Sequence, residues 1–165
     1  MDKTFSTPLS APDKSSHASG TAGHAYRTYG TVKSGSFGAT VAAPAVILIV
    51  EDSGDLRWCA AEYLRICGFE VVETQNAGDA LAAIEGGLHV DLVFTDINMP
   101  GAMDGAALAR WLAVNRPLLP IILTSGDSRP DLERATPRRR FVRKPYSLDA
   151  LEHDVRELVG TSVMQ

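Results

Sequence analysis

The sequence contains only two cysteines, Cys59 and Cys67, eight positions apart. They fall in a segment with helical periodicity, which would separate them by about 12 Å, more than a disulfide can span. Neither belongs to a CxxC motif, and no histidine lies near them in the sequence. The pattern indicates neither a redox pair nor a zinc site, and we expect both cysteines to be small residues of the hydrophobic core.

Long apolar runs are also absent. No apolar stretch approaches the roughly 18 residues that span a bilayer, and the N-terminal segment lacks the hydrophobic region of a signal peptide. We therefore expect a cytoplasmic protein with no membrane partner.

A basic surface of the kind that binds nucleic acid is missing as well. The formal net charge is −4; residues 1–44 carry +2, which leaves −6 for residues 45–165. An acidic domain is a poor ligand for a phosphate backbone. The three arginines at 138–140 are most simply a solvated loop, and we expect no nucleic-acid partner.

Periodic hydrophobicity is absent from residues 1–44. Ser, Thr, Gly, Ala and Pro account for 28 of these 44 residues. A segment of this composition buries too little apolar surface to offset the entropy of folding. We expect a disordered tail over 1–44, followed by one folded domain over 45–162.

The domain alternates short apolar runs with longer polar intervals. Each interval exceeds the roughly 12 residues that a parallel crossover needs, so the pattern predicts an α/β fold with a doubly wound, five-stranded parallel sheet. The expected strands cover residues 46–50, 69–73, 90–95, 119–124 and 141–143.

Helical signals occupy the intervals. Asp104 and Ser147 are placed to cap the helices that follow them. A helix within 127–137 would be short and bracketed by prolines, and therefore the least stable. The first helix has apolar residues at i, i+3, i+4 and i+7 spacing, which predicts one buried stripe. The stripe consists of Leu56, Cys59, Ala60, Tyr63, Leu64 and Cys67.

Polar residues follow the apolar runs in a recurring way. Parallel strands bring their carboxyl ends to one edge of a sheet, where ligands bind. If the acids at the ends of the first and third strands share a site, these two strands must be neighbours. Right-handed crossover connections then predict the strand order 2-1-3-4-5. The residues expected at this edge are Glu51, Asp52, Asp96, Thr124, Ser125 and Lys144.

Three carboxylates in one pocket call for a cation. At about 5 Å and an effective dielectric near 20, each pair repels by roughly 3 kcal/mol. Ligation by oxygen alone suits Mg²⁺ better than Zn²⁺. We expect Asp52, Asp96 and the backbone carbonyl of Asn98 to be direct ligands, with Glu51 acting through water.

The same residues suit phosphoryl chemistry. Asp96 could attack a phosphorus centre and form an acyl phosphate. Lys144 would pair with one phosphoryl oxygen, and the Thr124 hydroxyl would donate to another. These three residues are the candidate catalytic group.

With these features the sequence resembles the receiver domains of two-component response regulators, over about residues 45–160. The motifs are ILIVEDS with the acidic pair, DLVFTDINMPGAMDG with Asp96, ILTSG with Thr124, and FVRKPYS with Lys144. The resemblance implies a flavodoxin-like (βα)5 fold and a phosphoryl group supplied by a histidine kinase or histidine phosphotransfer protein. It also implies Asp96 as phosphoacceptor, with Thr124 and Phe141 as switch residues. Turnover would be limited to self-catalysed phosphoryl acceptance and loss, without an external substrate.

The printed sequence ends soon after the last expected helix, so we expect a single-domain regulator that signals by contact with an unknown downstream protein. Two alternatives remain open. One is a hydrolase with a nucleophilic aspartate, although such enzymes place a second aspartate where this chain has Asn98. The other is a non-phosphorylated adaptor of the same fold, which would need a disabled site residue.

Some residues have two interpretations. Glu51 and Asp52 would also suit the N-terminus of a helix without binding metal. Trp58 falls opposite the predicted buried stripe, near Ala61, where it could dock the phosphodonor or lie flat on its own helix. The loop after Asp96 is one residue longer than is common in the family, and Ser125 narrows access to the site.

Overall fold

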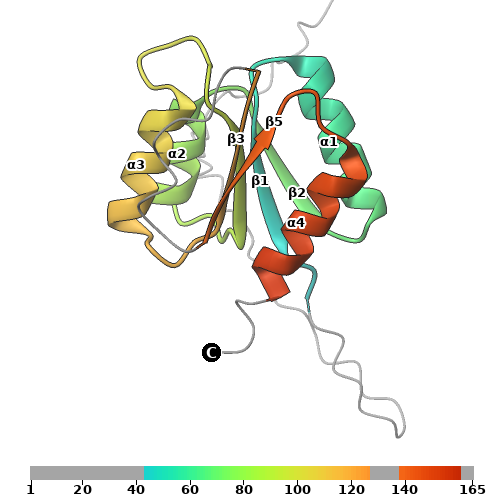
Figure 1. Cartoon of the computed structure of the whole chain (residues 1–165). Helices are drawn as coiled ribbons and strands as arrows, with labels where there is room; N and C mark the ends of the chain where they lie inside the picture. Colours follow the sequence, from blue (N-terminus) through green and yellow to red (C-terminus); the bar gives the residue numbers. More distant parts are fainter. Residues whose placement is uncertain (1–42, 127–137, 161–165) are drawn as a thin grey trace, which may run out of the picture. The chain divides into compact units, whose positions relative to one another are not determined.

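The computed structural model describes residues 43–126 and 138–160, and Figure 1 shows its architecture. The described strands form a five-stranded parallel sheet in the order β2-β1-β3-β4-β5. The predicted fold class and strand order are confirmed. The strands are β1 (Val46–Val50), β2 (Glu70–Thr74), β3 (Leu92–Asp96), β4 (Ile121–Ser125) and β5 (Arg139–Arg143). The helices are α1 (Gly54–Ile66), α2 (Ala77–Glu85), α3 (Gly105–Asn115) and α4 (Leu148–Gly160).

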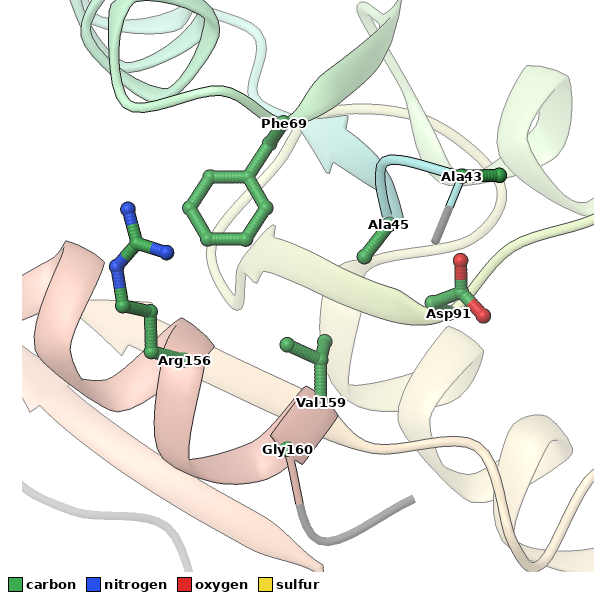
Figure 2. A pocket seen from close by; sticks show the side chains of 7 residues that line it. All are labelled: Ala43, Ala45, Phe69, Asp91, Arg156, Val159 and Gly160. Atoms are coloured by element: carbon green, nitrogen blue, oxygen red, sulfur yellow. The ribbon is translucent and has the colours of Figure 1, made fainter. Parts of the chain in front are cut away.

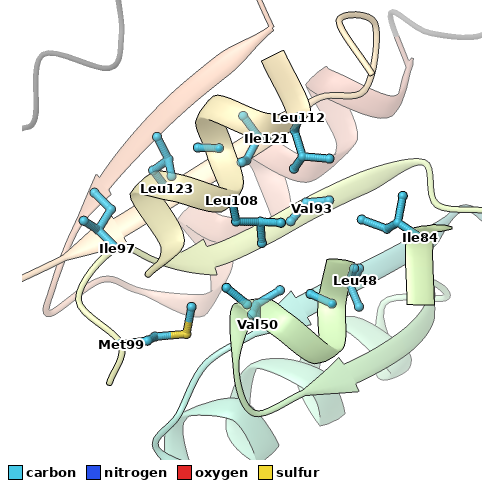
Figure 3. Close-up of a cluster of buried hydrophobic side chains, with 13 residues drawn as sticks. Leu48, Val50, Ile84, Val93, Ile97, Met99, Leu108, Leu112, Ile121 and Leu123 are labelled. Carbon is cyan, nitrogen blue, oxygen red and sulfur yellow. The ribbon is translucent and has the colours of Figure 1, made fainter. Parts of the chain in front are cut away.

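The sheet is covered on both faces. Helices α1 and α4 lie on one face, and α2 and α3 lie on the other (Figure 1). Alternate residues of each central strand point to opposite faces, so Leu48 packs on the α2–α3 side while Ile47 and Ile49 pack on the α1–α4 side. Figure 3 shows the first of these clusters, with Leu108 and Leu112 of α3 against the central strands.

Two predicted helix caps are confirmed. The Asp104 side chain accepts a hydrogen bond from Ala107 N–H at 2.7 Å, and the Ser147 hydroxyl accepts one from Ala150 N–H at 3.1 Å. These caps satisfy amides that helical geometry leaves without partners. The expected helix within 127–137 and the expected tail over 1–44 lie outside the described residues, except for residues 43 and 44.

The buried face of α1 differs from the predicted stripe. Cys59 is exposed and Cys67 is only partly buried, so the expectation that both are core residues is wrong. The buried residues of this helix are Ala60, Ala61 and Leu64. The small side chains of Ala60 and Ala61 allow α1 to pack closely against the sheet. With this face of the helix buried, Cys59 lies on the exposed side. Ala61, placed beside Trp58 on the outer face in the prediction, is fully buried.

The arginine run is part of the sheet. Arg139 and Arg140 pair in register with Ile121 and Ile122, so their interpretation as a solvated loop is wrong. Arg140 forms ion pairs with Asp154 and Glu157 of α4. An edge strand tolerates such residues because long side chains can cover apolar surface while their charged ends reach acidic partners. Among the described helices, none has the length and hydrophobicity required to cross a membrane.

Candidate functional site

The register of the central strands brings the predicted acids together. Val50 at the end of β1 lies opposite Thr95 of β3, so Glu51 and Asp96 follow at neighbouring positions of the same edge. On the other side of β3, Asp96 pairs directly with Thr124 of β4. The edge predicted from the sequence therefore exists, with β3 at its centre.

Three carboxylates gather at this edge. One oxygen each from Glu51, Asp52 and Asp96 lies within 4.8 Å of the others. Glu51 is 2% exposed and Asp96 is 7% exposed, whereas Asp52 is open to solvent. Burial makes this concentration of negative charge costly unless cations neutralise it.

Lys144 supplies one such cation. Its Nζ donates hydrogen bonds to Glu51 Oε2 at 2.7 Å and to Asp96 Oδ2 at 2.5 Å. Burial alone would lower the pKa of Lys144, but its hydrogen bonds to Asp96 and Glu51 and their charges raise it overall. Burial raises the pKa of Glu51 even though Lys144 opposes this effect, and the charge of Asp96 adds to the rise. The Lys144 ammonium group thus contacts two of the three carboxyl groups, those of Glu51 and Asp96.

Backbone contacts hold Asp96 in place. Asn98 N–H donates to Asp96 Oδ1 at 3.0 Å, and the Thr95 hydroxyl donates to the carbonyl of Asp96 at 2.9 Å. Gly105 packs directly against that carbonyl, because a Cβ atom built on Gly105 would lie 1.8 Å from it. The contribution of Thr95 and the close approach of Gly105 were not predicted. In the sequence, residues 101–105 (GAMDG) indicate only a turn and the start of a helix. The contact between Gly105 and Asp96, nine residues earlier, forms only when the chain folds, so the sequence pattern does not reveal it.

Thr124 and Phe141, the predicted switch residues, lie on the neighbouring strands β4 and β5. Thr124 is fully buried, and its hydroxyl has no hydrogen-bond partner among the described residues. A buried hydroxyl without a partner is costly, so it could readily donate to an incoming acceptor. Phe141 pairs with Leu123, the residue before Thr124, and is partly buried against the α2–α3 cluster.

An apolar groove of about 460 Å³ adjoins the acidic edge. It lies between the start of α1 and the segment between β5 and α4, and Lys144 belongs to both the groove and the acidic site. Trp58 is 61% exposed and Leu56 is 44% exposed, which confirms that Trp58 points outward. The groove is lined by Leu56, Cys59, Lys144, Pro145, Tyr146 and Leu148.

A second cavity of about 460 Å³ lies at the opposite edge of the sheet (Figure 2). The Arg156 guanidinium lies 5.0 Å from the centre of the Phe69 ring and donates to the carbonyl of Cys67 at 2.9 Å. Asp91, at the other side of this cavity, accepts a hydrogen bond from Val46 N–H at 2.8 Å. These polar groups already have partners within the fold, and they lie at the sheet edge opposite Asp96.

Comparison with known proteins identifies the class of this domain. Residues 47–156 match the family model of the response regulator receiver domain. The chain therefore belongs to this family, and the resemblance inferred from its motifs is confirmed.

Individual relatives agree with this assignment. The chain is 38% identical over 123 residues to the C4-dicarboxylate transport transcriptional regulatory protein DctD of Rhizobium meliloti, a match that covers 70% of this chain and 25% of DctD. The chain thus spans only a quarter of that relative's length.

Solved structures show the same architecture. The chemotaxis protein CheY4 of Vibrio cholerae has a TM-score of 0.63 and 23% identity over 70% of this chain and 99% of CheY4, and this match supports the fold alone. The response regulator TrrA of Thermotoga maritima, solved in complex with Mg²⁺ and BeF, has a TM-score of 0.62 and 31% identity. That match covers 69% of this chain and 98% of TrrA.

Replacing Lys144 with methionine is expected to lower the free energy of unfolding by about 1–3 kcal/mol at pH 7 in metal-free buffer, because two buried carboxylates lose a charged hydrogen-bond donor. The loss should shrink at acidic pH. Glu51 already has a raised pKa, and removal of Lys144 raises it further. A carboxyl group with a raised pKa in the folded state is destabilising when ionised, and this cost disappears as pH falls through that pKa.

Urea denaturation of the parent and the Lys144→Met variant at pH 7 and at about pH 5 would measure this difference. Lys144→Arg retains the charge and serves as the control. Equal destabilisation by Lys144→Met at both pH values would contradict the electrostatic account.

Proposed function

We propose that this receiver domain acts in the cytoplasm as part of a response regulator that signals by protein contact. It accepts a phosphoryl group on Asp96 from a histidine kinase or a histidine phosphotransfer protein, in a reaction that depends on Mg²⁺. The observation that carries the proposal is the grouping of Asp96 with Glu51, Asp52 and Lys144 at one edge of the sheet.

The donor set fits a hard divalent cation. Three carboxylates provide oxygen ligands, and one ammonium group leaves their charge only partly neutralised. Oxygen ligands with access to water suit Mg²⁺. Asp52, Asp96 and the Asn98 carbonyl would hold the ion, with Glu51 acting through water, and the bound ion would supply charge neutralisation at the phosphoryl oxygens. The Mg²⁺–BeF complex of TrrA supports this assignment by similarity.

The chain's own residues can carry out the transfer. A carboxylate oxygen of Asp96 attacks phosphorus, the bond from phosphorus to the donor histidine nitrogen breaks, and the imidazole leaves with that electron pair. Asn98 N–H, which donates to Asp96 Oδ1, orients the carboxylate for the attack. The Lys144 ammonium, now hydrogen-bonded to Asp96 Oδ2, can move to a phosphoryl oxygen.

The output would follow from the new charge. An acyl phosphate replaces one carboxylate charge with about −1.5 to −2 and three acceptor oxygens. The Thr124 hydroxyl, which has no hydrogen-bond partner in the described part of the chain, can donate to one of these oxygens. Its movement would change the packing of Phe141 through the adjoining β5 strand. Phe141 has no hydroxyl, so the change would act through packing on a downstream protein partner.

Incubation of the full chain with a small acyl phosphate, with and without Mg²⁺, tests the proposal. Intact mass measurement should reveal a Mg²⁺-dependent phosphoryl adduct, and peptide mapping should locate it on the segment that contains Asp96. An adduct that forms equally in chelator would contradict the metal dependence. Sustained release of phosphate from an external phosphate ester would favour the hydrolase alternative.

Trp58 is the proposed docking residue for the phosphodonor, because it is a large aromatic side chain exposed on α1, the helix that also lines the groove beside Lys144. Trp58→Ala is expected to slow transfer from a phosphohistidine protein by about tenfold, the effect of losing an aromatic anchor. Transfer from the small acyl phosphate should not change, since that donor needs no protein interface.

Ile66→Ala provides a matched control on the same helix, because Ile66 is 82% exposed at the far end of α1. Transfer rates would be followed with a phosphohistidine protein that phosphorylates the parent chain. Equal rates for the parent and Trp58→Ala would favour the interpretation that Trp58 lies on its own helix.

A further inference from the structure

Ser125 connects the two segments that carry the chemistry of the site. It is the last residue of β4 and is only 2% exposed. Its hydroxyl accepts a hydrogen bond from Asn98 Nδ2 at 2.9 Å, and its backbone carbonyl accepts one from Lys144 N–H at 2.9 Å. One residue therefore contacts both the loop after Asp96 and the start of the segment after β5.

These contacts extend the sheet beyond its strands. After the paired residues Asp96 and Thr124, Ile97 N–H donates to the carbonyl of Thr124 at 2.9 Å. The next contact in the same direction is between the side chains of Asn98 and Ser125. The hydrogen bond from side chain to side chain thus continues the β3–β4 pairing into a loop, where Asn98 itself is exposed.

We propose that Ser125 is a positioning residue for metal binding, acting through Asn98. The inference rests on the proposed function, because it assigns the Asn98 carbonyl to the Mg²⁺ site. Two contacts of Asn98 bear on this role: its N–H donates to Asp96 Oδ1 at 3.0 Å, and its side-chain amide donates to the Ser125 hydroxyl at 2.9 Å. These two contacts together hold the backbone N–H and the side chain of Asn98, which restricts the backbone conformation at this residue, so that its carbonyl is preorganised as a ligand.

The arrangement also ties this loop to the switch. Ser125 follows Thr124 directly, so a movement of Thr124 toward a phosphoryl group displaces the residue that holds Asn98. Ser125 thus narrows access to the phosphoryl site and at the same time makes a specific contact with Asn98. An alanine would leave more space but could not hold Asn98.

A double-mutant cycle tests the proposal. Calorimetric titration of the full chain with Mg²⁺ alone would compare the parent with Ser125→Ala, Asn98→Ala and the double variant. Asn98→Ala keeps the backbone carbonyl and N–H of residue 98. Loss of one hydrogen bond is expected to raise the Mg²⁺ dissociation constant of Ser125→Ala by about two- to tenfold. In the Asn98→Ala background, Ser125→Ala should cause no further rise.

The outcomes separate the inference from the proposed function. No Mg²⁺ binding by the parent chain would overturn both. Binding by the parent with an unchanged dissociation constant in Ser125→Ala would overturn only the role of Ser125. An equal rise in the Mg²⁺ dissociation constant in both backgrounds would also overturn the role of Ser125, because Ser125 would then act on the fold in general. In that case Ser125→Ala would lower the melting temperature in chelator by the same amount with and without the Asn98 side chain.

Discussion

Replacing Asp96 with asparagine is expected to abolish the phosphoryl adduct that a small acyl phosphate produces in Mg²⁺. An amide is a much weaker nucleophile than a carboxylate, and it removes one of the three negative charges that would hold the metal. The substitution keeps the size of the side chain. Intact mass spectra of the parent and variant, recorded after equal incubation, should differ by the whole adduct peak.

Asp91→Asn is the matched control, because Asp91 precedes β3 at the opposite end of the strand and its carboxylate faces the cavity of Figure 2. This variant should retain the adduct. An adduct that persists in Asp96→Asn, or that disappears equally in Asp91→Asn, would remove Asp96 from the acceptor position. Glu51 or Asp52 would then need to be examined as acceptors.

Replacing Gly105 with alanine is expected to destabilise the domain by about 3 kcal/mol and to disturb the phosphoacceptor. The added Cβ atom would lie 1.8 Å from the carbonyl oxygen of Asp96, 2.8 Å from its carbonyl carbon and 2.9 Å from the Thr95 hydroxyl. Backbone atoms cannot rotate away as a flexible side chain can. The β3 end or the start of α3 must therefore shift, and Gly105 N–H would lose its 3.1 Å bond to the carbonyl of Ile97.

Urea denaturation in chelator would measure the loss of stability, and the rate of adduct formation would report the displacement of Asp96. Gly54→Ala is the control, because a Cβ atom there meets only the end of the Arg57 side chain at 3.9 Å. Gly54 begins α1, where alanine should change stability by no more than about 1 kcal/mol. A stable Gly105→Ala variant with normal adduct formation would show that the loop relaxes without cost.

Local patterns were sufficient for the order of the elements. The apolar runs at 46–50 and 119–124 and the intervals between runs predicted parallel crossovers, and the structure contains the predicted sheet. Strand limits shifted by one or two residues, as at β5, which begins at Arg139 rather than 141. Arg140 in this strand forms ion pairs with Asp154 and Glu157 of α4, which lie more than ten residues away in the sequence.

The predicted site residues came together for a related reason. Each of these residues lies at the carboxyl end of a strand or just past it, and parallel strands bring such residues to one edge whatever their side-chain rotamers. They are Glu51, Asp52, Asp96, Thr124 and Lys144. Their proposed functions remain predictions. The contacts that join them, such as Lys144 with both Glu51 and Asp96, depend on side-chain geometry that spacing does not encode.

The sequence by itself determined the family, the sheet order and the set of acids, hydroxyl and lysine at the carboxyl edge, because strand periodicity and strand-end chemistry are local properties. Only the tertiary structure decided that Cys59 faces outward, that Gly105 touches the backbone of Asp96, and that Ser125 holds Asn98. These features depend on how a helix is rotated against the sheet and on contacts between segments distant in sequence. Such contacts are set by packing of the whole domain, which no local pattern records.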